Sequence, residues 1–133
     1  MKKGYKGAIA SEVIGNPNFR KVLYTGSQLQ LVAMTLQPKE DIGAEDHDGH
    51  DQFFHIVSGV GEALIGETTY EIAAGDMVIV PSGEMHNVSN TSETDIMEFY
   101  TTYSPPEHRD KVVHATKAEA EADDEHFDGT TTE

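Results

Sequence analysis

The chain has 133 residues, which is enough for one domain that buries a core without covalent cross-links. It contains no cysteine, and this excludes disulfides, thiolate metal sites and a cysteine nucleophile. The formal net charge of −15 argues against nucleic acid and anionic membranes as partners, because an acidic surface repels both.

The chain opens with two lysines directly after Met1, but its first fifteen residues lack the apolar run that a signal peptide requires. No stretch of the chain approaches the ~18 consecutive apolar residues of a membrane-spanning helix. We therefore expect a soluble, cytoplasmic protein.

Short β-rich runs dominate the chain from residue 20 onwards. The first two cover residues 20–26 and 28–38, and the later ones cover 53–59, 61–67, 68–75, 77–80 and 94–103. Gly, Asp, Asn or Ser separates each run from the next, a pattern typical of an all-β sandwich or barrel. Pro81 directly follows the run 77–80, so it ends that strand or lies on a sheet edge.

The acidic C-terminal region differs in character from the rest of the chain. The prolines at 105 and 106 interrupt strand structure, so we expect a barrel domain over residues 1–106 and a connector with an acidic helix or tail over 107–133. Thr116 and Glu119 form a capping-box pattern that opens a short helix. Residues 115–133 carry a net charge of −6 and only one large apolar side chain, Phe127. We expect a frayed end at 128–133 and little contribution of the tail to folding.

Residues 45–59 read EDHDGHDQFFHIVSG, with three histidines and four carboxylates ahead of an apolar run. Glu45 and His47 lie two positions apart, so on a strand their side chains share one face. On the following strand, one face carries Gln52, Phe54 and Ile56. The opposite face carries Phe53, His55 and Val57.

Residues 75–90 read GDMVIVPSGEMHNVSN. Two turns enclose the buried run MVIV, and His86 then begins the next strand, on the face that MVIV also covers. A single histidine in this position is more often a hydrogen-bonded structural residue than a metal ligand.

The spacing of this second stretch resembles that of the cupin family. The second cupin motif is G-x5-P-x-G-x2-H-x3-N, and Gly75, Pro81, Gly83, His86 and Asn90 match every position. The resemblance extends over residues 20–103 and is to small, single-domain bacterial or archaeal cupins of the conserved-barrel type. A group of these small cupins also carries E-x-H, DQF, HNV and PPEH, as this chain does.

The first cupin motif, H-x-H-x3–4-E-x6-G, is matched in part. Aligning on Gly59 places Gln52 at the family's glutamate, His47 at its second histidine and Glu45 at its first. The glycine that leads the motif corresponds to Lys39. Two of the four ligand positions therefore depart from the family pattern.

The resemblance implies an all-β cupin barrel, a jelly-roll-like double-stranded β-helix, that holds one divalent metal. Carried over residue by residue, it implies Glu45, His47, Gln52 and His86 as metal ligands. Two imidazoles, one carboxylate and one amide oxygen suit manganese, iron or zinc. His50 is an alternative ligand to Gln52, although a solvated loop histidine is the simpler interpretation.

The sequence is compatible with two functions. The first is a metal-dependent enzyme of isomerase, lyase or dioxygenase type that acts on a small organic acid or sugar-like substrate. The second is a non-catalytic barrel that binds a small ligand at a modified or vestigial metal site. We also expect a homodimer, because Phe53 and Val57 form an outward apolar strip. His108 and His114 follow the barrel strands and are expected to be structural.

Overall fold

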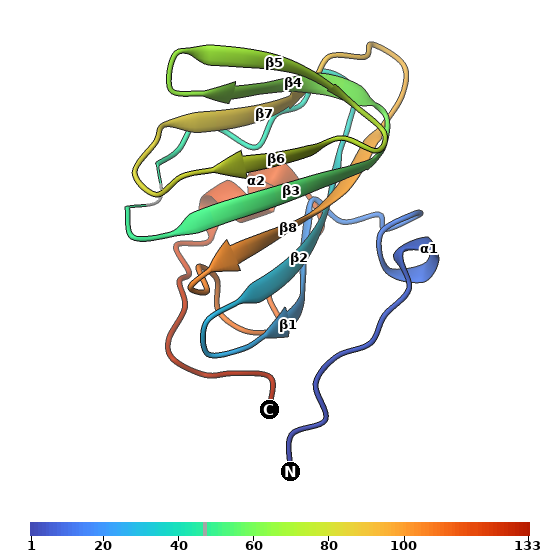
Figure 1. Ribbon diagram of the computed structural model, residues 1–133. Coiled ribbons are helices and arrows are strands. Elements are labelled where there is room, and N and C mark those ends of the chain that lie inside the picture. The colour runs from blue at the N-terminus through green and yellow to red at the C-terminus, as the bar shows by residue number, and fades with distance from the viewer. Residues whose placement is uncertain (47) are drawn as a thin grey trace.

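The structure is a computed structural model that describes residues 1–46 and 48–133 (Figure 1). These ranges contain, in chain order, α1 (Ile9–Glu12), β1 (Arg20–Thr25), β2 (Gln30–Leu36), β3 (Asp51–Ser58), β4 (Val60–Ile65), β5 (Thr68–Ala73), β6 (Met77–Val80), β7 (His86–Asn90), β8 (Met97–Ser104), β9 (Val113–His114) and α2 (Lys117–Ala122).

The strands form two antiparallel sheets that face each other across the core (Figure 1). The larger sheet has the order β6-β3-β8-β2-β1-β9, and the smaller one has the order β5-β4-β7. Neighbours in each sheet are often distant in sequence, as in the pairing of β3 with β8. The predicted all-β barrel with a short C-terminal helix is confirmed.

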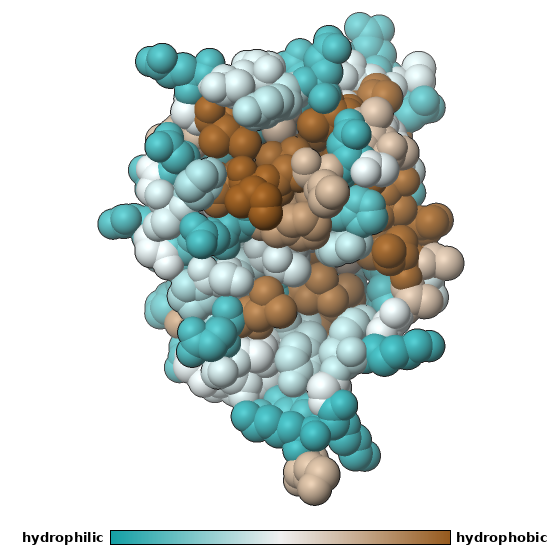
Figure 2. Space-filling view, in the orientation of Figure 1, coloured by the Kyte–Doolittle hydropathy of each residue, from teal (hydrophilic) through white to brown (hydrophobic). Residues whose placement is uncertain are grey.

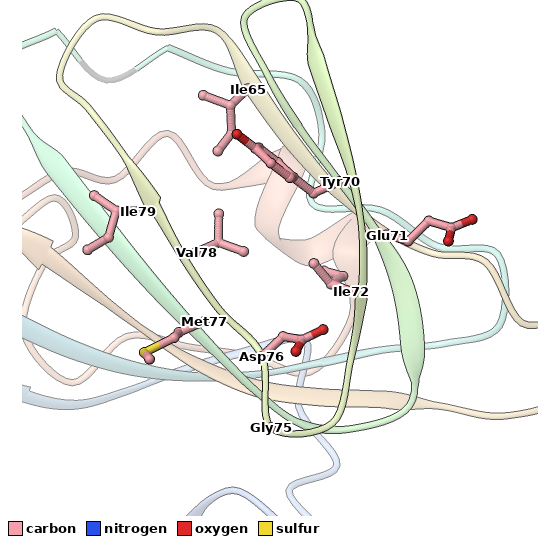
Figure 3. Close-up of a pocket in the computed structure, with 9 residues that line it drawn as sticks. All are labelled: Ile65, Tyr70, Glu71, Ile72, Gly75, Asp76, Met77, Val78 and Ile79. Carbon is pink, nitrogen blue, oxygen red and sulfur yellow. The ribbon is translucent and has the colours of Figure 1, made fainter.

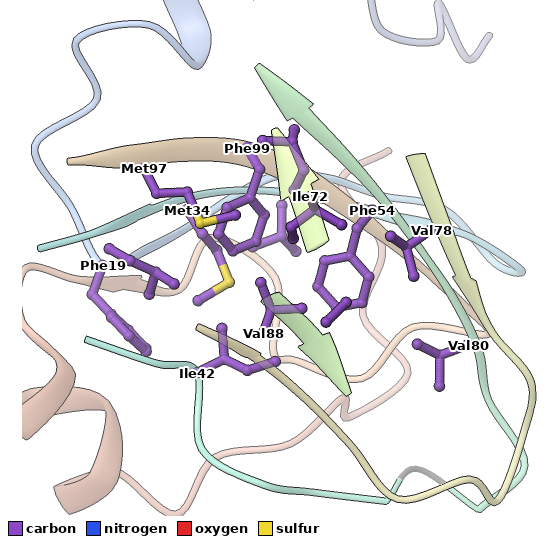
Figure 4. Packing of buried hydrophobic residues seen from close by; sticks show 14 of the residues in the cluster. Phe19, Met34, Ile42, Phe54, Ile72, Val78, Val80, Val88, Met97 and Phe99 are labelled. Atoms are coloured by element: carbon purple, nitrogen blue, oxygen red, sulfur yellow. The ribbon is translucent and has the colours of Figure 1, made fainter. Parts of the chain in front are cut away.

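The inner face of β3 is the one that sequence alternation predicts. Gln52, Phe54 and Ile56 are buried, whereas Phe53 and His55 are partly exposed. Phe54 packs against Phe99 of β8 with ring centroids 5.8 Å apart, and both rings face apolar side chains of the smaller sheet (Figure 4). Burial of such side chains contributes about 1.5–3 kcal/mol each, so this core is the main source of stability.

Two glycines of the second motif occupy turn positions that other residues rarely adopt. Gly75 has a φ of +94° before β6, and Gly83 has a φ of +85° in the turn that follows it. A side chain at a positive φ clashes with its own backbone, which explains why the motif has glycine at these places. The two turns set the directions of β6 and β7, and in these strands Val80 and His86 are both buried.

Two short elements lie outside the predicted strands and helix. Helix α1 has only four residues and buries none of its side chains. Strand β9 has two residues and pairs with the start of β1.

The C-terminal segment lies along the barrel rather than away from it. The Thr116 side chain accepts a hydrogen bond from Glu119 N at 3.1 Å, as the capping pattern predicts, and Ala120 of α2 packs against the core. Beyond the helix, Phe127 N donates to Glu107 O at 2.9 Å and Thr132 N donates to Thr25 O at 2.8 Å. The expectation of a frayed end at 128–133 is therefore wrong.

The two ends of the chain also meet (Figure 1). Lys3 N donates to the Glu133 side chain at 2.7 Å. Among the described residues, neither helix has the length or apolar character needed to cross a membrane.

Candidate metal and ligand site

Glu45 and His86 form a directly opposed antiparallel pair. Glu45 N donates to His86 O at 2.9 Å, and His86 N donates to Glu45 O at 2.8 Å. Directly opposed residues place their side chains on the same side of the pair. The side chains of Glu45 and His86 therefore project from the same side of this pair, which brings together residues from both sequence motifs.

Gln52 joins this pair from β3, and its amide has a fixed orientation. Thr101 Oγ1 donates its single hydrogen to Phe53 O at 2.8 Å. Thr101 Oγ1 must then accept the contact from Gln52 Nε2 at 3.0 Å. The amide nitrogen of Gln52 thus points to Thr101, and its carbonyl oxygen points to His86.

His86 is 1% exposed, and each of its ring nitrogens faces an acceptor. Nδ1 lies 3.1 Å from Glu84 O, and Nε2 lies 3.0 Å from Gln52 Oε1. A neutral imidazole has one hydrogen and satisfies only one acceptor. With that hydrogen on Nδ1, the lone pairs of His86 Nε2 and Gln52 Oε1 converge, and a cation between them would satisfy both.

His47 lies outside the described residues, so the structure does not test it as a ligand. Within residues 1–46 and 48–133, no group of three or more His, Cys, Asp or Glu is arranged to hold a metal ion. Three of the four predicted ligands therefore lie within the described residues. The structure brings them together, because Glu45 pairs with His86 and Gln52 contacts the imidazole of His86.

The loop before β3 is fastened to the turn of the second motif. Asp51 accepts a hydrogen bond from Ser82 N at 2.9 Å, and Gly49 N donates to Ser82 Oγ at 2.8 Å. These bonds hold the two motifs in register at the end of the barrel where Gln52 and His86 meet. The exposed acid Asp51 thus has a structural role.

His50 contacts the segment that follows β8. Its Nδ1 lies 2.8 Å from Pro105 O, and its Nε2 lies 3.2 Å from the Glu107 carboxylate. Both ring nitrogens therefore face acceptors of this segment. This geometry favours a role in holding the loop over a role as a substitute for Gln52.

Tyr103 is a further residue of the site, and strand register places it there. It lies directly opposite Gln52 in the pairing of β8 with β3, and it is 1% exposed. Burial and the negative charge of Glu45 raise the pKa of Tyr103 well above its usual range, while a side-chain hydrogen bond from Gln52 acts in the opposite direction. The phenol is therefore neutral near pH 7. Sequence alternation could not identify it, because the register of β8 was unknown.

Two other side chains of β8 serve the fold instead. Tyr100 lies on the outer face, where its hydroxyl contacts His55 Nδ1 at 2.9 Å. Glu98 accepts from Gly15 N at 2.6 Å and from Ser58 Oγ at 2.7 Å. His55 is thus kept on the face away from Gln52, as predicted.

Two buried histidines beyond β8 contact carboxylates of the C-terminal segment. His108 Nδ1 lies 2.7 Å from Glu125 Oε1, and His114 Nε2 lies 3.0 Å from Asp123 Oδ2. Burial lowers the pKa of His108, although the contact with Glu125 favours its charged form. The second ring nitrogen of His108 lies 3.3 Å from the Tyr103 hydroxyl. Both contacts tie the C-terminal segment to the rest of the protein, and His108 also reaches the Tyr103 hydroxyl.

A separate groove of about 560 Å³ lies between β5 and β6 (Figure 3). Apolar side chains of both strands line it, including Tyr70 and Val78, and Asp76 lies near Gly75 at the turn between the strands. Its lining residues come from β5, β6, the turn between them and Ile65, so the groove is distinct from the cluster around His86.

Known proteins resemble this chain in sequence and in structure. The crystal structure of BH2720 from Bacillus halodurans has a TM-score of 0.88 and 35% identity, over 91% of this chain and 96% of that one. The uncharacterized protein L612 of Acanthamoeba polyphaga mimivirus is 39% identical over 75% of this chain and 64% of its own length. The oxalate-binding protein of Thermotoga maritima is 33% identical over 47% of this chain and 52% of its own length. The chain thus spans less than two thirds of each of these two curated relatives.

The description of the matching family is Cupin domain, and the match covers residues 32–103. This range runs from β2 to β8 and includes both motifs and every candidate ligand. The match spans more than half of the chain, and the two facing antiparallel sheets have the expected architecture. This chain belongs to the cupin family.

Proposed function

We propose that this protein is a small metal-binding cupin, with Glu45, His47, Gln52 and His86 as ligands to manganese, iron or zinc. We further propose that it is a metal-dependent enzyme of isomerase, lyase or dioxygenase type, acting on a small organic acid or sugar-like molecule. The observation that carries the proposal is the surroundings of His86. Its two ring nitrogens face two acceptors, and the neighbouring Glu45 supplies negative charge.

The donor set fits a divalent ion. Glu84 O is placed to accept the hydrogen of His86 when that hydrogen lies on Nδ1, and the Thr101 hydroxyl turns the carbonyl oxygen of Gln52 toward Nε2. Backbone and hydroxyl partners of this kind orient the ligands of metal sites in general. Gln52 is 2% exposed, and in such buried surroundings a cation and the Glu45 carboxylate attract each other more strongly than in water.

A divalent metal bound here would act as a Lewis acid that polarises a carbonyl or carboxylate oxygen of the substrate. Four protein ligands on an octahedral ion leave two positions for oxygen atoms of a small molecule. If Glu45 is not a ligand, its carboxylate is positioned to act as a general base beside the ion.

A small carboxylic acid is the substrate class that we favour within this proposal. The curated relative from Thermotoga maritima is named an oxalate-binding protein. Oxalate offers two adjacent carboxylate oxygens, and this is the geometry that two open positions on one ion accept. The likeness covers about half of each chain, so it supports a class of ligand rather than a particular reaction.

The alternative is a non-catalytic barrel that binds a small ligand. Gln52 favours it, because this neutral amide stands where the family has a glutamate, and a neutral ligand holds a cation less firmly. Both proposals use the same site, and they differ in whether the bound small molecule is converted to a product.

The test is metal analysis of the untagged protein, followed by titration with Mn²⁺, Fe²⁺ and Zn²⁺. The double variant His47→Ala, His86→Ala should lose the metal, whereas His55→Ala should keep it, because His55 lies on the outer face. Equal metal content in all three proteins would rule out the ligand assignment. Incubation of the loaded protein with oxalate and related small acids, followed by product analysis, separates the enzyme from the binding module.

A further inference from the structure

We propose that Glu125, in the C-terminal segment, is a positioning residue for the metal site. It acts through His108 and Tyr103 to hold the carbonyl oxygen of Gln52 toward His86. This inference rests on the proposed function, because it concerns how the same site is kept ready for a cation. Its basis is a series of side-chain neighbours that runs from Glu125 through His108 and Tyr103 to Gln52.

The chain begins at the amide of Gln52, whose nitrogen has two hydrogens. One is donated to Thr101 Oγ1 at 3.0 Å. Tyr103 lies directly opposite Gln52 in the pairing of β8 with β3, and a side-chain hydrogen bond from Gln52 acts to lower the pKa of its phenol. When both hydrogens are engaged in this way, the carbonyl oxygen has only the opposite direction left. That direction is toward His86 Nε2, at 3.0 Å.

The Tyr103 hydroxyl accepts from Gln52 and has one hydrogen of its own to donate. The neighbouring acceptor is His108 Nε2, at 3.3 Å. This nitrogen accepts a hydrogen only if the single hydrogen of the neutral imidazole lies on Nδ1. The tautomer of His108 therefore decides whether Tyr103 accepts from Gln52 or competes with it.

Glu125 fixes that tautomer. Its Oε1 lies 2.7 Å from His108 Nδ1, and a carboxylate only accepts, so the hydrogen of the ring stays on Nδ1. The Glu125 side chain is 2% exposed, and Arg109 N holds its second oxygen at 3.3 Å. Gln30 secures His108 from the other side by accepting from its backbone N at 2.9 Å and donating to its carbonyl at 2.8 Å.

The consequence is a remote contribution of the acidic tail to the site. Without Glu125, His108 is free to carry its hydrogen on Nε2 and donate it to the Tyr103 hydroxyl. Tyr103 would then direct its own hydrogen toward Gln52, and the amide would have to turn its oxygen away from His86 to receive it. An outer partner of a metal ligand typically contributes about 10- to 100-fold to metal affinity.

The test compares two single substitutions in the same segment. Glu125→Ala removes the acceptor for His108, and Asp123→Ala removes the acceptor for His114, which is outside the chain that leads to Gln52. Titration with MnCl₂ should show affinity reduced about 10-fold for Glu125→Ala and changed less than about twofold for Asp123→Ala. Tyr103→Phe keeps the ring and should weaken binding as much as Glu125→Ala does. Equal losses for Glu125→Ala and Asp123→Ala, or none for Glu125→Ala, would overturn the inference.

A second measurement needs no metal, so it separates this inference from the proposed function. The ¹⁵N shifts of His108 in the metal-free protein should report a hydrogen on Nδ1 in the wild type and in Asp123→Ala. Glu125→Ala should lose that preference and shift the side-chain amide signals of Gln52. If the wild type binds no metal but shows this pattern, the proposed function fails and the positioning chain stands. A hydrogen on Nε2 of His108 in the wild type would refute the chain itself.

Discussion

Arg20 Nη1 donates to His114 Nδ1 at 3.2 Å, and this contact sets the polarity of the ring. A guanidinium always donates, so Nδ1 of His114 accepts and Nε2 carries the hydrogen that Asp123 receives. Both partners are buried and come from opposite ends of the chain. The acidic segment after α2 is therefore tied through His114 to Arg20 of β1, and through His108 to the segment that follows β8.

Truncation after Lys117 should destabilise the protein. It removes Glu125 and so leaves a buried donor of His108 without its acceptor, which typically costs about 1–3 kcal/mol. It also removes Ala120 from the core and the two backbone hydrogen bonds that Phe127 and Thr132 make. Thermal unfolding should show a midpoint lower by several degrees, roughly 2–4 °C for each kcal/mol lost.

The matched control for the truncation is Asp124→Asn. Asp124 is exposed and lies between the two acids that contact histidines, so its substitution changes the charge of the segment but not these contacts. Its unfolding midpoint should match that of the wild type. A truncated protein as stable as the full chain would show that the segment only rests on the barrel.

Stability should fall as the pH drops below about 6.5. Burial lowers the pKa of His108 from its usual 6.5, so the unfolded chain binds a proton there before the folded one does. Burial raises the pKa of Glu125, but the hydrogen bond from His108 outweighs this effect, and its net pKa lies below 4.5. Both shifts favour the unfolded state as the pH falls, first below 6.5 and then below 4.5.

Thermal midpoints measured between pH 8 and pH 4 test this prediction. We expect a plateau above pH 7 and a decline that starts near pH 6.5. The variant His108→Gln should lack the first part of the decline, whereas His126→Gln should retain it, since His126 is exposed. A midpoint that rises as the pH falls from 7 to 5 would contradict the prediction.

The barrel was predictable because its signals are local. Alternation placed Gln52, Phe54 and Ile56 on the buried face, and glycine turns marked where β6 begins and ends. The two-residue strand β9 has no such signal, because it exists only through pairing with Arg20 and Lys21 of β1. Tyr103 entered the site through register with Gln52, which a single sequence does not reveal.

The C-terminal segment shows that the charge of a segment does not reveal which of its acids contact the barrel. Asp123 and Glu125 belong to an acidic run that is indistinguishable from a solvated one. Their partners lie 9 and 17 residues away, on segments whose position depends on the closed barrel. Tertiary contact gives these two acids a role that composition could not indicate.

Gln52→Glu should raise metal affinity and lower the stability of the metal-free protein. It restores the family's carboxylate beside His86 and adds a negative charge that a divalent ion favours. Without the ion, that charge is buried at a site 2% exposed in the wild type, and the donor to Thr101 Oγ1 is lost. We expect the free energy of unfolding to fall by about 1–3 kcal/mol without metal, and a larger increase in midpoint on addition of Mn²⁺ than the wild type shows. Unchanged Mn²⁺ affinity would argue against Gln52 as a ligand.

The outer face of the larger sheet should mediate a homodimer. Phe53 of β3 is paired directly with Ile79 of the edge strand β6, and Ile79 and Met77 are 62% and 73% exposed. Figure 2 shows apolar side chains gathered over this region of the surface and surrounded by polar ones. A monomer would leave this strip in water, whereas a two-fold pairing covers it on both copies at once.

Light scattering at micromolar concentration should therefore give twice the chain mass, and Ile79→Glu should give the monomer mass. Val113→Glu, at another exposed apolar position, should remain dimeric. A monomer mass for the wild type would refute the assembly, and a dimeric Ile79→Glu would place the interface elsewhere.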